Sequence, residues 1–301
     1  MSYLEALILG IVQGVFMFVP VSSTAHLVLT QHLMIGMGSD LPAPESPQMI
    51  LFDLVVHVGT LVSIAVVFRR SLLALIRAAG REVVAALRPA TDEPVVRTGL
   101  RASRPFLWLL LMGGVTVAVT GVLGLSLRRY FELVFATPQM LVLTLSVTAL
   151  LLFLTDRLGR RPLGVKAIGL RIAVVIGIAQ TLALIPGISR SGMTIIAGLF
   201  SGLKRRWAAE YSFLVAIPTI LAASLVQSLD VWRGDGLDGV GAGALLVGFV
   251  TAALVGTVAL RLVLAALYHA QLKIFSAYLL LLAALVGFGV LDAPIFTGAP
   301  H

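Results

Sequence analysis

Residues 186–194 read Pro-Gly-Ile-Ser-Arg-Ser-Gly-Met-Thr, and they lie inside a segment that is otherwise apolar enough to cross a bilayer. An arginine at membrane depth costs about 2.5–3.5 kcal/mol on insertion scales, so Arg190 needs a partner. The neighbouring Ser189, Ser191 and Thr194 supply hydroxyls, and Gly187 lets backbone approach a ligand closely. Because a guanidinium, hydroxyls and free amides together bind anionic oxygens, the stretch predicts a phosphate site inside a membrane.

The composition around this stretch is that of a membrane protein. Of the 301 residues, 59% are hydrophobic and 12% are charged, against about 25% charged in soluble domains. The apolar signal covers the whole chain, which predicts one integral membrane domain over 1–301. The chain has no cysteine, so disulfides and thiolate metal sites are excluded. The basic isoelectric point is explained by the positive-inside rule, and no nucleic-acid partner is expected.

Apolar runs of about 20 residues are long enough to span a bilayer, and six of them predict an all-α polytopic protein. They cover 50–68, 106–126, 139–155, 208–228, 242–261 and 274–291.

Two further apolar stretches, 4–31 and 172–202, are interrupted near their middles by Pro20 and Pro186, each followed by hydroxyl residues. Each stretch is long enough for two half-helices. The interruption therefore predicts two re-entrant helix hairpins that enter and leave on the same side. Irregular backbone at that depth is tolerated where it is buried in protein or lines a cavity.

The distribution of charge gives the orientation. Of the 22 basic residues, 18 fall in the loops after the first span, the third span, the second hairpin and the fifth span. Basic loops face the cytoplasm, so both termini are expected to be periplasmic or extracellular. The first hairpin then opens outward and the second inward. The acidic residues that fall on the outer side are Asp40, Glu45, Asp230, Asp235 and Asp238.

Short sequence echoes agree with that orientation. Gly10-Ile-Val-Gln resembles Gly177-Ile-Ala-Gln, and the Pro-Val-Ser-Ser-Thr run from Pro20 resembles the stretch from Pro186. Such echoes predict an inverted-topology repeat with halves 1–155 and 156–301. Inverted repeats whose broken helices meet at the midplane are common in transporters.

Polar residues of the first hairpin are candidates for chemistry at the phosphate. Gln13 shares a helical face with position 17, and Ser22 shares one with His26. If the two hairpin tips meet, these residues and Ser23 would surround the phosphate that Arg190 holds. Histidine can act as acid, base or nucleophile near neutral pH, and serine can act as a nucleophile beside such a base.

Structural roles compete with these functional ones. A histidine in an apolar helix is commonly a packed core residue, and hydroxyls in membrane helices commonly join helices. Asp53 and His57 on the first span are explained as simply by polar packing at a helix end. Arg190 is the exception, because an unpaired guanidinium has few structural uses there. The basic segment 69–104 is either a solvated cytoplasmic loop or an amphipathic helix on anionic lipid.

Three motifs then resemble the undecaprenyl-diphosphatase family of bacterial inner membranes, and the resemblance runs over nearly the whole chain. They are Gly-Ile-Val-Gln-Gly…Phe-Val-Pro-Val-Ser-Ser-Thr-Ala-His from Gly10 to His26, the stretch from Gln180 to Thr194, and Tyr-Ser-Phe-Leu-Val-Ala-Ile-Pro-Thr from Tyr211. The resemblance implies six transmembrane helices plus two re-entrant pairs. It also implies hydrolysis of undecaprenyl diphosphate to undecaprenyl phosphate, which recycles the lipid carrier for cell-wall synthesis.

The resemblance assigns roles position by position. Arg190 would bind the diphosphate, and Ser23 and His26 would occupy the catalytic serine and histidine positions, with the nucleophile left open between them. The implied substrate-binding set is Gln13, Ser22, Thr24, Gly187, Ser189, Ser191 and Thr194.

Met17 departs from the family pattern. The family has glutamate at this place, where it is thought to serve a divalent cation, Mg²⁺ or Ca²⁺, or proton handling. A thioether neither coordinates a hard cation usefully nor accepts a proton. Asp53 could supply a carboxylate only if it reaches the site.

Two functions follow from these residues. Ser23, His26 and the complete 186–194 stretch favour a hydrolase. Met17 favours a polyprenyl-phosphate flippase or transporter that binds phosphate without hydrolysing it. Both use a polyprenyl diphosphate or phosphate lipid and the surrounding membrane lipid as partners, and the sequence leaves a homodimer open.

Overall fold

A computed structural model of the chain describes residues 1–44, 46–87, 100–134, 138–185, 187–233 and 240–288. Every regular element of more than three residues in those ranges is an α-helix, which confirms the all-α prediction. The helices are α1 (Tyr3–Phe16), α2 (Ser23–Gly36), α3 (Pro47–Val67), α4 (Arg69–Leu87), α5 (Leu100–Ser103), α6 (Pro105–Val134), α7 (Pro138–Asp156), α8 (Leu170–Leu182), α9 (Arg190–Phe200), α10 (Arg205–Arg233), α11 (Ala242–Tyr268) and α12 (Lys273–Gly287).

Four of these helices are long and apolar enough to cross a membrane, namely α3, α10, α11 and the first 23 residues of α6. The other two predicted spans, 139–155 and 274–291, correspond to α7 and α12, which are apolar but shorter. The chain is therefore a multi-pass membrane protein. Glu45, Asp235 and Asp238, used to orient it, lie outside the described residues.

Local sequence signals explain where the helices begin. Ser2 and Glu5 form a capping box at the start of α1, because the Ser2 hydroxyl accepts from the Glu5 amide and the Glu5 carboxylate accepts from the Ser2 amide. Ser46 caps α3, whose first residue is Pro47, a residue favoured at this position because it needs no amide partner. Polar caps therefore satisfy the first amides of both helices.

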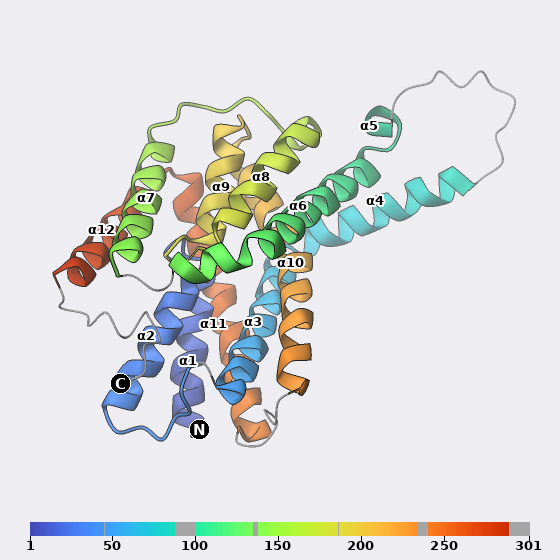
Figure 1. The fold of residues 1–301 in the computed structure, drawn as a ribbon. Helices are drawn as coiled ribbons and strands as arrows, with labels where there is room; N and C mark the ends of the chain where they lie inside the picture. Colours follow the sequence, from blue (N-terminus) through green and yellow to red (C-terminus); the bar gives the residue numbers. More distant parts are fainter. Residues whose placement is uncertain (45, 88–99, 135–137, 186, 234–239, 289–301) are drawn as a thin grey trace, which may run out of the picture.

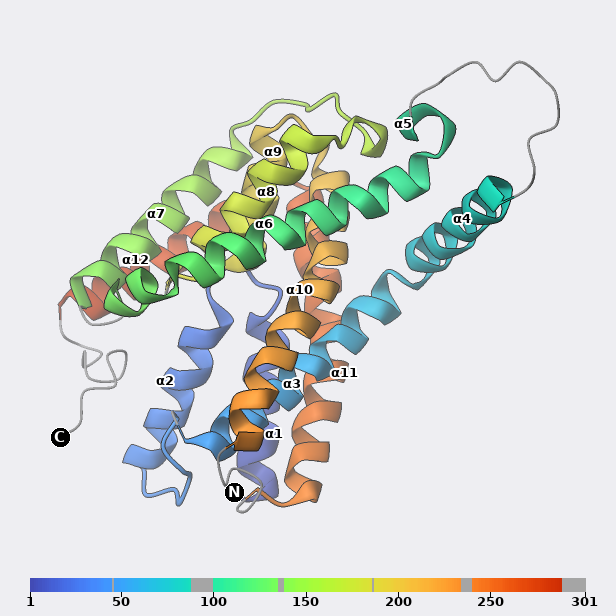
Figure 2. The same ribbon diagram turned by 45° about the vertical axis from the view of Figure 1, so that its right-hand side comes forward.

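The two interrupted stretches each fold into a pair of helices that turns back near the middle of the molecule (Figure 1). From the lower end of the view α1 rises to Met17, and α2 returns toward that end. In the opposite sense α8 descends from the upper end and α9 returns to it (Figures 1 and 2). The turn between α1 and α2 and the turn between α8 and α9 meet in the interior, where the functional site is expected.

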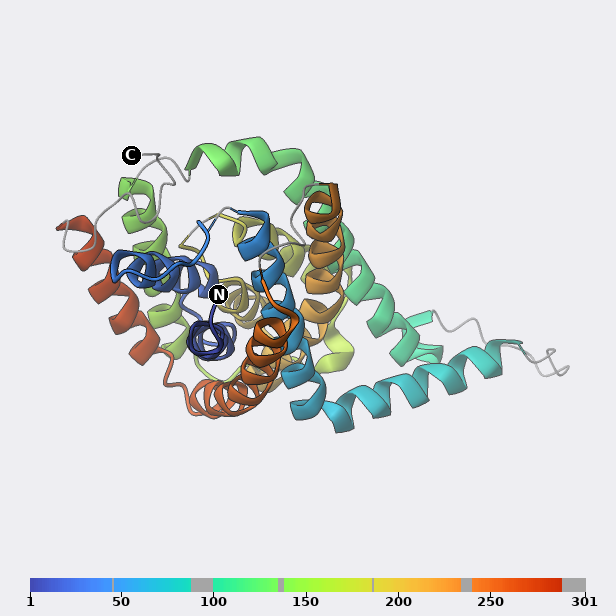
Figure 3. The same ribbon diagram turned by 90° about the horizontal axis from the view of Figure 1, so that it is seen from below.

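The basic segment 69–104 is helical over most of its described length. Seen from below, α4 projects sideways from the bundle (Figure 3). Glu82 joins α4 to the start of α6. Its carboxylate accepts hydrogen bonds from the backbone amides of Phe106 (3.2 Å) and Leu107 (2.8 Å). The helical alternative for this segment is therefore the correct one for α4, although 88–99 lie outside the description.

Glycines allow the closest helix contacts in the bundle. A Cβ atom added to Gly59 of α3 would lie 2.6 Å from the carbonyl oxygen of Phe249 in α11, and one added to Gly14 of α1 would lie 2.9 Å from the amide nitrogen of Gly256. Both distances are shorter than van der Waals contact, so α11 packs against α1 and α3 only because these positions lack side chains.

Gly59→Ala should therefore lower the thermal midpoint of the purified protein, because overpacking typically costs about 1–3 kcal/mol. Gly114→Ala in α6 is the matched control, since nothing lies within 4 Å of its added Cβ. Replacing glycine by alanine in an open helical position favours folding by up to about 1 kcal/mol, so this control should unfold at the same or a higher temperature. Equal midpoints for the two variants would contradict the packing of α3 on α11.

Candidate functional site

The two turns meet at the thioether of Met17. This residue ends α1 and is 6% exposed. The Arg190 Nη2 atom lies 3.7 Å from the Met17 Sδ atom, the Gln13 Nε2 atom 3.6 Å and the Ser23 Oγ atom 3.9 Å. Three hydrogen-bond donors from α1, α2 and α9 thus converge on a sulfur, which is a weak acceptor. The guanidinium is left without a strong acceptor among the described residues.

The start of α9 adds further groups that suit an anion. Arg190 is the first residue of this helix, and Ser189 caps it by accepting from the Gly192 amide at 3.2 Å. Free amides and the positive end of the helix dipole lie at a helix N-terminus, which is a common phosphate-binding position. The Ser191 hydroxyl donates across to the Phe18 carbonyl at 3.4 Å and so joins the two turns. The hydroxyl of Thr194 is instead used within α9, where it donates to the Arg190 carbonyl at 2.9 Å.

The space between the turns is small. A cavity of about 10 Å³, room for about one water molecule, is bounded by Met17, Arg190, Ser191 and Thr194. On the first turn Ser22 has φ 69° and ψ 90°, a backbone conformation that L-residues rarely adopt. Backbone strain of this kind concentrates at functional sites. A ligand as large as a diphosphate would have to displace side chains here.

The imidazole of His26 is held by contacts with α1, the first turn and α12. Its Nδ1 atom lies 2.8 Å from the Ser22 carbonyl, which can only accept, so this nitrogen carries a proton. Its Nε2 atom lies 2.6 Å from the hydroxyl of Tyr278 in α12, and its ring stacks on Phe16 with centroids 3.9 Å apart. Ser22 precedes α2 and contacts His26 through its backbone carbonyl, so the predicted helical face shared by the two side chains stays a prediction. Sequence reasoning missed Tyr278, because one tyrosine in an apolar helix gives no signal of a partner 252 residues away.

The remaining residues that the sequence suggested for the site differ in burial and in their contacts. Gly187 is buried, with φ 80°, and an added Cβ would collide with Leu141 and Thr144 of α7, so its glycine is required by packing. Thr24 is exposed, and Pro186 lies outside the described residues. Asp53 accepts a hydrogen bond from the Gln31 amide at 3.0 Å.

The side chains near Met17 do not form a binding site for a resident Mg²⁺ or Ca²⁺. No group of three or more His, Asp or Glu side chains able to hold an ion occurs in the part of the chain that the structure describes. The hard oxygens beside the sulfur are the Ser23 hydroxyl and the buried Gln13 Oε1, which has no hydrogen-bond partner there. Hard cations prefer six or more oxygens that include carboxylates, so this donor set does not fit one.

Comparisons with known proteins agree with the motifs. The family model described as bacitracin resistance protein BacA matches residues 6–285. A protein of Halorhodospira halophila named undecaprenyl-diphosphatase is 53% identical over 292 residues, which cover 96% of this chain and 98% of that protein. One of the same name from Alkalilimnicola ehrlichii is 54% identical over 288 residues, covering 95% and 96%. Another, from Moorella thermoacetica, is 34% identical and covers 95% and 97%.

Proposed function

The chain belongs to the bacitracin resistance protein BacA family, and we propose on this premise that it hydrolyses undecaprenyl diphosphate to undecaprenyl phosphate and phosphate in the bacterial plasma membrane. Relatives that share its whole length carry the name of this activity. The single observation that carries the proposal is the convergence of Arg190, Gln13 and Ser23 on one buried point between two helix turns. A cation with hydroxyl and amide donors is suited to a diphosphate and to the charge of its transition state.

In this proposal Arg190 and the amides at the start of α9 hold the diphosphate, and Ser23 lies on the opposite turn, where it faces the terminal phosphoryl group. Either a water attacks the phosphorus directly, or the Ser23 hydroxyl attacks first and a water then releases the phosphoryl group from Ser23 as phosphate. In both cases the bond from the terminal phosphorus to the bridging oxygen breaks, and undecaprenyl phosphate leaves. The proton of the attacking hydroxyl or water passes to the Nε2 atom of His26. The Nδ1 atom cannot take it, because it already carries a proton that it donates to the Ser22 carbonyl. The Tyr278 hydroxyl lies 2.6 Å from Nε2, so it holds the imidazole in place and can accept a hydrogen bond from this nitrogen once it is protonated.

We also propose that the two helix pairs are re-entrant and that the halves 1–155 and 156–301 form an inverted repeat. Equivalent glycines support this, because Gly10 brings α1 against α11 and Gly177 brings α8 against α6. Equivalent glutamines also support it, since Gln13 and Gln180 are both buried with an amide oxygen that has no partner among the described residues. The termini would then be periplasmic, with the first pair opening to that side.

The direct test uses purified full-length protein with undecaprenyl or farnesyl diphosphate and Mg²⁺, and measures released phosphate. The proposal expects release that is saturable in the lipid and absent from an Arg190→Ala preparation. Release equal in both preparations, or in neither, would refute the hydrolase.

One observation favours a transporter instead. The acceptor at the point of convergence is a thioether, so phosphate binding can persist where acid–base chemistry is weakened. A flippase would move a labelled polyprenyl phosphate across liposome bilayers without releasing phosphate, and that pair of results would replace the hydrolase with the transporter.

Tyr278→Phe should lower kcat about three- to tenfold with little change in KM, because it removes only the hydroxyl that holds His26. Tyr130→Phe, at an exposed position of α6, is the control and should leave both constants unchanged. A change confined to KM would show that Tyr278 acts on lipid binding and not on the imidazole.

A further inference from the structure

A second cavity lies at the other end of α9. It has a volume of about 420 Å³, and cationic residues from two separate segments line it. Arg160 and Arg161 follow α7, Lys204 directly precedes α10, and Arg205 is the first residue of α10. Leu199 lines it near the end of α9, nine residues after Arg190, which places the two sites about 14 Å apart along the helix axis. The cavity is therefore distinct from the space between the two turns.

Backbone hydrogen bonds hold the cationic segments together. The Leu163 amide donates to the Gly202 carbonyl at 3.1 Å, and the Lys204 amide donates to the Leu163 carbonyl at 2.9 Å. This short parallel bridge fixes the connection before α8 beside the start of α10. The bridge keeps the segments of Arg161 and Lys204 beside one another, although the like charges of these two lining residues repel.

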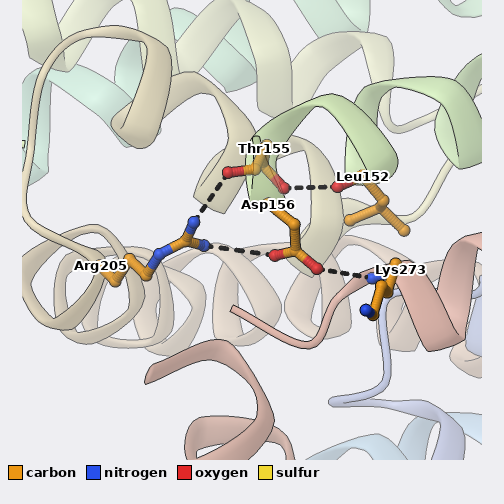
Figure 4. Close-up of polar contacts among 5 residues, drawn as sticks. All are labelled: Leu152, Thr155, Asp156, Arg205 and Lys273. Atoms are coloured by element: carbon orange, nitrogen blue, oxygen red, sulfur yellow. Dashed lines mark hydrogen bonds and ion pairs between the residues drawn. The ribbon is translucent and has the colours of Figure 1, made fainter. Parts of the chain in front are cut away.

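Among the described residues that line the cavity, the one carboxylate is Asp156, and it already accepts hydrogen bonds. Asp156 accepts from the Arg205 guanidinium at 3.4 Å and from the backbone amide of Lys273 at 2.8 Å (Figure 4). Arg205 also donates to the Thr155 carbonyl at 2.8 Å, so this arginine and Asp156 together form a fixed part of the wall. Neither can neutralise the remaining cations.

Three cations remain without a counter-ion. Among the described residues no ion pair involves Arg160, Arg161 or Lys204. The Nε atom of Arg161 is buried and has no hydrogen-bond acceptor within those residues. A buried donor of this kind is unfavourable unless a ligand or water supplies an oxygen.

We propose that this cavity is a second phosphate-binding site. Three cations around a pocket of this volume suit a tetrahedral oxyanion with several acceptor oxygens, and the volume lies in the range of small-molecule sites. The phosphate is either that of an anionic lipid headgroup or free inorganic phosphate. The site lies among the basic connecting segments, so it holds phosphate at the opposite end of α9 from Arg190.

The test measures binding to the purified full chain and to two triple variants that lose equal charge. Arg160→Gln, Arg161→Gln and Lys204→Gln alter the cavity, whereas Arg70→Gln, Arg77→Gln and Arg81→Gln alter exposed cations of α4. One arm measures phosphatidylglycerol, against phosphatidylcholine, retained in detergent after gel filtration. The other measures radiolabelled phosphate by equilibrium dialysis. The cavity triple should lose binding at least tenfold in one arm, and the α4 triple should stay within twofold.

Loss in the lipid arm alone identifies a headgroup, and loss in the dialysis arm identifies free phosphate. Equal behaviour of the two triples in both arms, or no binding in either arm, would overturn the proposal. If the cavity triple does not fold, Lys204→Gln alone changes one exposed side chain and should weaken binding about threefold, and unchanged binding would overturn it. The difference between the cavity triple and the α4 triple should persist when both also carry Arg190→Ala, and its disappearance would place the ligand at the first site and overturn the proposal.

Discussion

Arg190→Ala is expected to reduce kcat/KM for farnesyl diphosphate about 10³-fold, with loss of detectable substrate binding. Loss of one preorganised donor to a developing anion costs about 10²–10³ in rate, and Arg190 is the cation at the point where the two turns meet. A 10³-fold loss corresponds to about 4 kcal/mol of transition-state stabilisation. Steady-state phosphate release and a binding measurement with the same lipid check both parts.

Arg190→Lys is the matched control for charge. It keeps a cation but loses the planar fork that binds two phosphate oxygens at once, so it should recover only part of the lost rate. Thermal midpoints should stay close to that of the unaltered chain, because the one hydrogen bond that the guanidinium donates among the described residues goes to a thioether, a weak acceptor. Unchanged lipid binding in Arg190→Ala would remove Arg190 from the site.

Met17→Glu is expected to raise the rate of phosphate release about 10²-fold. The side chains of Gln13, Ser23 and Arg190 already point their donors at this position, so a carboxylate there would accept charge-assisted hydrogen bonds that sulfur accepts only weakly. It would also give the site a proton acceptor and a hard ligand for Mg²⁺. A positioned acid or base contributes about 10²–10⁴ in rate, and the lower figure allows for partial neutralisation of Arg190.

Met17→Gln separates these effects, because glutamine accepts hydrogen bonds but neither ionises nor binds Mg²⁺ well. We expect Met17→Gln to release phosphate at nearly the rate of the unaltered chain. For Met17→Glu we expect a rate of phosphate release that depends steeply on Mg²⁺ concentration. An equal rise in both variants would mean that hydrogen bonding, and not the carboxylate charge, limits this chain.

The helical organisation could be predicted from the sequence because membrane helices have strong local signals. Each of the six apolar runs coincides with a helix, and four of these helices are long and apolar enough to span a membrane. Each of the two interrupted stretches forms two helices, as their prolines predicted. The requirement that a cation in an apolar segment find a partner predicted a ligand for Arg190, but it did not predict that the Met17 thioether lies beside the guanidinium. These predictions rest on composition and spacing alone.

Contacts between distant helices were not predictable in the same way. The orientation of His26 depends on Tyr278 in α12, and the need for Gly187 depends on the side chains of α7. The bridge between Leu163 and Leu203 joins two connecting segments whose sequences carry no pairing signal. Such contacts arise from the packing of whole helices, which a periodicity along one segment does not encode.

The convergence of the two turns can be measured directly, because the chain has no cysteine. A Cβ at Gly192 would lie 3.2 Å from the Pro20 Cβ, a few tenths of an ångström shorter than the Cβ separation of about 3.5–4.5 Å in disulfides, so a small outward shift of either turn allows the bond. Pro20→Cys with Gly192→Cys should therefore form an intramolecular disulfide on mild oxidation in native membranes. Pro20→Cys with Phe200→Cys, about 12 Å further along α9, should not. A disulfide in the second pair and none in the first would contradict a site built from two turns that meet.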